Sequence, residues 1–71
     1  MKVVELALRD LAFNGRSGAY GARWVPWKLL LKQIEKETGL APDAIADRLA
    51  RQPGVKIDEA NDRLTRKPPN A

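Results

Sequence analysis

The chain has 71 residues and a formal net charge of +4, with 13 lysines and arginines against 9 aspartates and glutamates. Hydrophobic residues make up 44% of the chain, which fits one folded domain and is too many for a disordered chain. The sequence contains no cysteine and no histidine, which excludes disulfides, thiolate zinc sites and histidine-based acid–base catalysis. We therefore expect a small basic cytoplasmic protein that binds a partner and is not an enzyme, with no cofactor and no metal.

The N-terminal residues are not expected to form a signal peptide or a membrane span. Glu5, Arg9 and Asp10 interrupt the apolar residues that a signal sequence keeps together. No apolar run along the chain approaches the ~20 residues that cross a bilayer. Contact with a membrane is therefore not expected.

The first predicted element is a helix over residues 2–13. Its apolar residues Val4, Leu8 and Leu11 fall at i, i+4 and i+7 along one face, and Ala7 lies on the same side. Asn14 and Gly15 tolerate the left-handed conformation and are expected to end this helix. The glycine-rich segment 15–22 predicts a flexible loop, with Tyr20 as a candidate anchor.

A short strand and a second helix are predicted around Pro26. Residues 23–25 are expected to be extended, because a proline biases the residue before it away from helical backbone. Pro26 also suits the first position of a helix, so the second helix is expected over 26–38, before Gly39. Its apolar stripe consists of Trp27, Leu30, Leu31 and Ile34.

A third helix and a hairpin complete the predicted elements. Pro42 suits the start of a helix over 42–52, and the following Pro-Gly pair is expected to stop it. Residues 55–58 and 63–67 alternate apolar and polar side chains, as half-buried strands do. Turn-forming residues separate them, so an antiparallel hairpin is predicted over 55–67.

The three helices and the hairpin are expected to share one core. Its predicted members are Leu8, Leu11, Leu30, Ile34, Ile45, Leu49, Ile57 and, on the second hairpin strand, Leu64. The predicted fold class is α+β, mainly α with a small β-hairpin. One domain is expected over 1–67, followed by a disordered tail over 68–71.

This order of elements resembles the winged helix-turn-helix domain over nearly the whole chain. The resemblance rests on Trp24-Val25 as the short strand, on Thr38-Gly39-Leu40 between two helices, and on Pro53-Gly54-Val55 before the hairpin. It implies a three-helix winged helix-turn-helix fold whose third helix enters the major groove of duplex DNA and whose hairpin, the wing, contacts phosphates. The expected function is that of a DNA-binding transcriptional or accessory regulator.

The resemblance places the nucleic-acid-binding residues on the third helix and on the wing. They are Arg48, Arg51 and Gln52 on the helix, and Lys56, Asn61, Arg63, Arg66 and Lys67 on the wing. Arginine and glutamine suit guanine and adenine edges, and cations neutralise phosphates. Asp43 and Asp47 count against this function, since carboxylates at the start of the third helix repel phosphate.

Other interpretations of the same residues stay open. Glu35 stands where the strict helix-turn-helix pattern has a small residue, which favours a winged-helix module that docks on a protein of the transcription or replication machinery. Arg51 is alternatively paired with Asp47 at i−4, and the basic wing residues alternatively protect a strand edge. The acidic residues Asp58 and Asp62 are expected to serve the hairpin turn.

The two tryptophans and two leucines also have alternative roles. Trp24 and Trp27 either stack on single-stranded nucleic acid or pack in the core, and core packing is expected for at least one. Leu6 and Leu29 lie off the best inward stripes and are candidates for a homodimer surface, although isolated exposed leucines are common.

Overall fold

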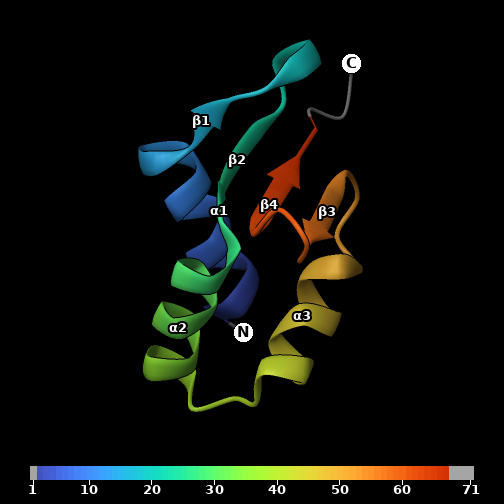
Figure 1. The fold of residues 1–71 in the computed structure, drawn as a ribbon. Helices are drawn as coiled ribbons and strands as arrows, with labels where there is room; N and C mark the ends of the chain where they lie inside the picture. Colours follow the sequence, from blue (N-terminus) through green and yellow to red (C-terminus); the bar gives the residue numbers. More distant parts are fainter. Residues whose placement is uncertain (1, 68–71) are drawn as a thin grey trace.

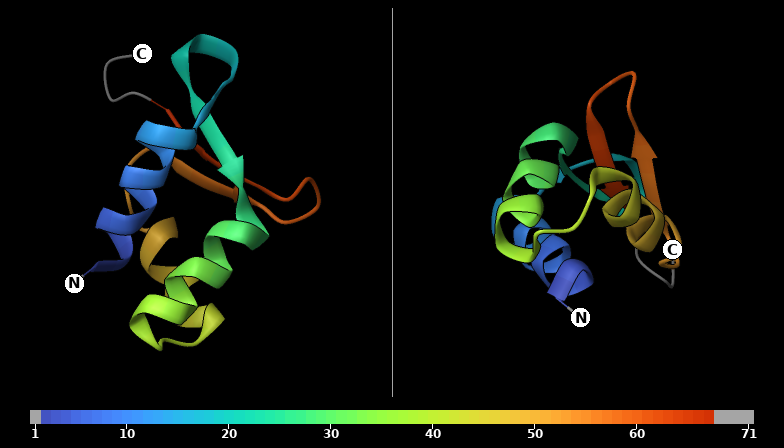
Figure 2. Two further views of the ribbon diagram at one scale, coloured as in Figure 1. Left: turned by 90° about the vertical axis from the view of Figure 1, so that its left-hand side faces the viewer. Right: turned by 90° about the horizontal axis from the view of Figure 1, so that it is seen from below.

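The computed structural model describes residues 2–67, so the predicted tail over 68–71 lies outside the described residues. Three helices lie on one side of a four-stranded sheet (Figures 1 and 2), which confirms the predicted α+β class. The helices are α1 (Lys2–Asn14), α2 (Trp27–Thr38) and α3 (Pro42–Ala50). The strands are β1 (Arg16–Ser17), β2 (Arg23–Pro26), β3 (Val55–Asp58) and β4 (Arg63–Arg66). None of these described helices is long and apolar enough to cross a membrane.

The sheet is antiparallel throughout and has the strand order β1-β2-β4-β3. The hairpin predicted over 55–67 is therefore present, and its second strand also pairs with β2. Val25 of β2 lies opposite Leu64 of β4, and both side chains are fully buried. This pair marks the face of the sheet that packs against the helices.

The core fills the space between the helices and that face of the sheet. Its buried members are Val3, Ala7, Leu11, Val25, Trp27, Leu30, Ile34, Ile45, Leu49 and Leu64. Burial is thus confirmed for most of the predicted core, but Leu8 and Ile57 are only partly buried. Ile57 lies on an edge strand, where fewer neighbours cover it.

The buried stripe of α1 differs from the predicted one. Val3, Ala7 and Leu11 are buried, whereas Val4 and Leu8 are half-buried. Both sets have helical spacing because the helix is apolar at several neighbouring positions. Apolar periodicity therefore identifies the helix, but it does not decide which of two apolar stripes, offset by one residue, faces the core.

The segment 15–22 contains regular structure, and its prediction as a flexible loop is wrong. Arg16 and Ser17 form β1 against β2, and the N–H of Gly18 donates to the carbonyl of Ala22 at 2.7 Å. Tyr20 is 88% exposed and does not anchor the segment. A two-residue strand is too short to show alternation, so its pairing with β2 has no signal in the local sequence.

Two predicted helix ends also require correction. Pro26 is the last residue of β2, with φ −59° and ψ 125°, and α2 begins at Trp27. The third helix ends at Ala50, so Arg51 and Gln52 lie in the turn that follows it. Pro53 explains the early end, because a proline disfavours helical backbone at the residue before it.

Asp62 in the hairpin turn caps the start of α2. Its carboxylate accepts a hydrogen bond from the N–H of Lys28 at 2.7 Å, and its carbonyl accepts from the N–H of Trp27 at 3.0 Å. Pro26 cannot supply a side-chain cap, so Asp62, which follows Lys28 by 34 positions, satisfies these free N–H groups. The hairpin turn is thereby fixed beside the start of α2 (Figure 2, left).

We expect Asp62→Ala to lower the free energy of unfolding by about 1–2 kcal/mol, the loss typical of a helix cap. The φ of 54° at Asp62 adds to the effect, because alanine adopts left-handed backbone less readily than aspartate. Denaturant unfolding followed by circular dichroism measures the change. Asp62→Asn is the control, since asparagine keeps the acceptor and the backbone preference. Equal losses in the two variants would contradict the capping role.

Candidate nucleic-acid interface

Within residues 2–67, no helix covers the second face of the sheet (Figure 1). Side chains alternate along a strand, so the residues next to Val25 and Leu64 point away from the helices. We call this surface the outer sheet face, and it consists of Arg16, Trp24, Pro26, Lys56, Asp58, Arg63 and Thr65. Three of these seven side chains are cationic and one is anionic.

Trp24 is at the centre of the outer sheet face. The guanidinium carbon of Arg63 lies 4.1 Å from the centroid of the indole ring, and that of Arg16 lies 5.6 Å from it. Trp27, in contrast, is 4% exposed in the core, which confirms the expectation that at least one tryptophan is buried. Two arginines from β1 and β4 thus stack on one aromatic side chain from β2.

Asp58, the carboxylate of the outer sheet face, is engaged by the hairpin turn. It accepts a hydrogen bond from the Asn61 side-chain amide at 2.8 Å and another from the Asn61 N–H at 3.2 Å. These bonds, with a smaller contribution from the charge of Arg63, lower the pKa of Asp58. Asn61 therefore serves the turn, and the predicted role of the acidic residues in turn chemistry is confirmed for Asp58 and Asp62.

The helical part of the predicted site is separate from the outer sheet face. Arg51 forms an ion pair with Asp47 at 3.0 Å, as the alternative interpretation expected, and Gln52 is half-buried in the turn after α3. Both partners of the pair are largely exposed, so it contributes little to stability. Arg48 is half-buried on α3, and Asp43 is exposed in its first turn.

The remaining predicted residues do not form one surface either. Arg66 lies opposite Arg23 in the register and points to the other face of the sheet from Arg63. Arg23 itself donates to the carbonyls of Leu11 and Ala12, at 3.4 and 3.2 Å, at the end of α1. The N–H of Lys67 donates to the carbonyl of Gly54 at 2.9 Å, at the base of the hairpin.

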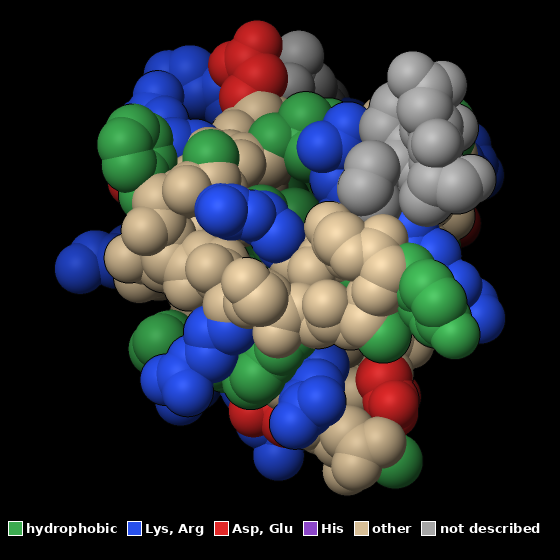
Figure 3. Space-filling model, turned by 90° about the horizontal axis from the view of Figure 1, so that it is seen from above, with side chains coloured by type: hydrophobic (Ala, Val, Ile, Leu, Met, Phe, Trp, Pro, Cys, Tyr) green, Lys and Arg blue, Asp and Glu red, His purple; other side chains and the backbone are tan. Residues whose placement is uncertain are grey.

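The predicted nucleic-acid-binding residues thus lie on separate parts of the surface, and the structure adds one residue to the candidate interface. Lys56 and Arg63 share the outer sheet face with Arg16, which the sequence did not indicate. No local pattern identifies Arg16, because its position depends on the pairing of β1 with β2. Viewed from above, the charged side chains at the end of the molecule near β1 are mostly basic (Figure 3).

A shallow depression separates α3 from β3. Asp47, Asp58 and Glu59 line it, together with the single cation Lys56. Its acidic lining makes it a poor surface for phosphates. Lys56 and Asp58 also belong to the outer sheet face, so the depression adjoins that face at β3, and the charged residues that it adds, Asp47 and Glu59, are both acidic.

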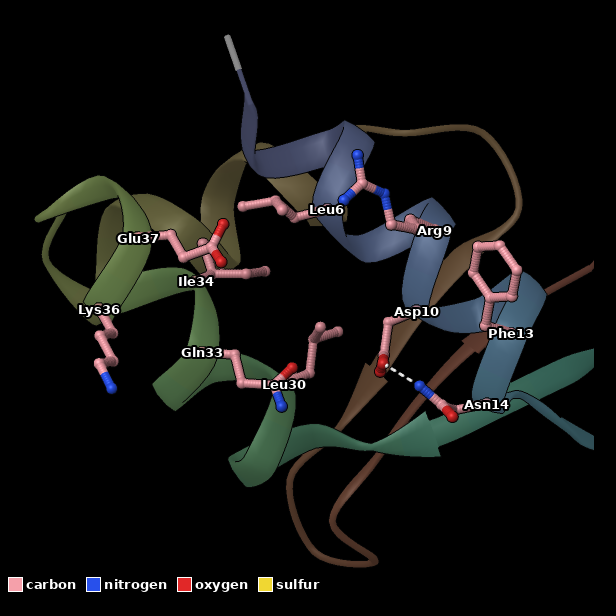
Figure 4. Close-up of a pocket in the computed structure, with 10 residues that line it drawn as sticks. All are labelled: Leu6, Arg9, Asp10, Phe13, Asn14, Leu30, Gln33, Ile34, Lys36 and Glu37. Atoms are coloured by element: carbon pink, nitrogen blue, oxygen red, sulfur yellow. Dashed lines mark hydrogen bonds between the residues drawn. The ribbon is translucent and has the colours of Figure 1, made fainter.

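A groove of about 580 Å³ lies between α1 and α2 (Figure 4). Leu6, Leu30 and Ile34 supply its apolar side chains, and Phe13 at its end is 81% exposed. Its charged lining residues are Arg9, Asp10, Lys36 and Glu37. Because these charges balance, the groove has no preference for an anion.

The chain was compared with family models, with curated proteins and with solved structures, and none of them matches it.

Proposed function

We propose that this chain is a small DNA-binding protein that contacts the phosphates of duplex DNA mainly through its outer sheet face. The observation that carries the proposal is the position of Arg16 and Arg63 over Trp24, with Lys56 further along the same row of the sheet, while Asp58 is bonded to Asn61. Neutralisation of phosphates by lysine and arginine supplies most non-specific affinity for DNA. The winged-helix resemblance also implies duplex DNA as the partner. A protein that binds DNA in this way would act as a cytoplasmic transcriptional or accessory regulator.

The third helix is expected to contribute little base recognition. Arg51 is paired with Asp47, and Gln52 is half-buried in the turn after α3, so neither side chain is well placed to reach base edges. We therefore propose binding with weak sequence preference.

The experiment is a titration of a labelled random-sequence duplex at several salt concentrations, followed by fluorescence anisotropy. We expect a Kd in the micromolar range or weaker that rises steeply with salt, because each phosphate contact adds about 0.9 to the slope of log K against log salt. Absence of binding at low ionic strength would contradict the proposal.

A protein-docking function is the second candidate, and the depression between α3 and β3 favours it. Asp47, Asp58 and Glu59 there suit a basic segment of a partner protein. This candidate gains if DNA binding is absent and if amide chemical shifts near these residues respond to a lysine-rich peptide.

A further inference from the structure

The stack of Arg16, Trp24 and Arg63 combines residues from three different strands. In the register, Arg16 lies directly opposite Trp24, and Thr65 lies opposite Trp24 on the other side. Arg63 is two residues from Thr65 and is therefore a diagonal neighbour of Trp24. The sheet must be complete before these three side chains meet.

The stack holds two like charges close to one ring. Like charges repel, and this repulsion decreases when an anion binds between or beside them. Asp58 lies opposite Arg63 in the register, yet its two carboxylate oxygens accept hydrogen bonds from Asn61. The charge of Arg63 still acts on Asp58 and helps to lower its pKa, but among the described residues the two side chains form no direct ion pair, so the N–H groups of Arg63 stay open to an external anion.

The indole also restrains the guanidinium group of Arg63, whose carbon lies 4.1 Å from the ring centroid, more closely than that of Arg16 at 5.6 Å. A guanidinium group packed on an aromatic face keeps the N–H groups along its edge available for hydrogen bonds. These planar donors match two oxygens of a phosphate, which a lysine ammonium does not do. The indole thus prepares the arginines for a bidentate ligand before that ligand arrives.

We propose that Arg16, Trp24 and Arg63 form a phosphate clamp that holds the sugar–phosphate backbone of duplex DNA across the outer sheet face. This inference rests on the proposed function and assigns its main contact to three residues. Lys56 extends the clamp, because it ends a row across the sheet that begins at Arg16 and runs through Trp24 and Thr65. Adjacent strands lie about 4.8 Å apart, so the row is about 14 Å long and reaches more than one phosphate.

The main test compares two double variants with the same change in net charge. Arg16→Gln with Arg63→Gln removes the clamp, whereas Arg9→Gln with Lys32→Gln removes two exposed cations from α1 and α2. We expect the clamp variant to lower the salt slope for a random duplex by about two, and the control to leave it nearly unchanged. Equal slopes in both variants, with wild-type binding intact, overturn the clamp and the outer sheet face as the main contact, and leave DNA binding by another surface of the chain standing. No wild-type binding at low salt overturns both.

Two further measurements separate a clamp from other contacts. Arg16→Lys with Arg63→Lys keeps the charge, and we expect it to weaken binding at constant net charge; unchanged affinity would overturn the bidentate contact. Emission from Trp24 should change when duplex is added, and Trp24→Phe should abolish that change. Tighter binding of a single strand than of the duplex would also overturn the clamp, because it would indicate base stacking on Trp24. Thermal melting of each variant verifies its fold.

Discussion

Replacing Leu49 with alanine is expected to lower the free energy of unfolding by about 2–5 kcal/mol. Leu49 is 1% exposed and packs in the core through α3, so truncation leaves a cavity. A small domain has a total stability of about 5 kcal/mol or slightly more, which makes this loss enough to unfold much of the protein. Urea unfolding followed by circular dichroism measures it.

Leu29→Ala is the matched control for this prediction. The same atoms are removed, but Leu29 is 60% exposed on α2. We expect a change within about 0.5 kcal/mol, as for most surface substitutions. A loss at Leu49 no greater than that at Leu29 would show that α3 does not pack as described.

Gly54→Ala is expected to destabilise the protein by more than Gly39→Ala. Both glycines have left-handed backbone, with φ of 78° and 72°, so each substitution costs about 1–2 kcal/mol. A Cβ at Gly54 would also lie 2.7 Å from the carbonyl oxygen of Lys67, whereas a Cβ at Gly39 would meet nothing within 4 Å. That overlap adds about 1–3 kcal/mol.

The two alanine variants together isolate the contact at the base of the hairpin. Their difference in unfolding free energy removes the shared cost of left-handed backbone and retains the overlap with Lys67. Differential scanning calorimetry of the two variants and the wild type provides the values. Equal stabilities would mean that the hairpin base moves to accommodate a methyl group without cost.

The fold class follows from the sequence because its main signals are local. The change from helical to alternating apolar spacing after Pro53-Gly54 predicts the hairpin, and the prolines and glycines predict most helix ends to within two residues. The errors arise where a residue far away in the sequence determines the local structure. Asp62 caps α2 from another part of the chain, and β1 exists because β2 lies beside it.

The candidate site is less predictable, for a related reason. The sequence identifies basic residues on the hairpin, but the face each residue occupies depends on strand register. Arg63 and Arg66 are three residues apart and therefore point to opposite faces. Arg16 joins the site only through β1, and the stack on Trp24 requires three strands at once.

The strand order has a consequence for how the protein is made. β4 is the last described strand to be synthesised, yet it lies in the interior of the sheet, between β2 and β3. In a nascent chain that ends at Asp58, β2 and β3 would lack the strand that lies between them, and Leu64 would be missing from the core. The four-stranded sheet is therefore completed only after residues 63–66 have emerged, and until then the apolar side chains of β2 and β3 stay exposed to other proteins.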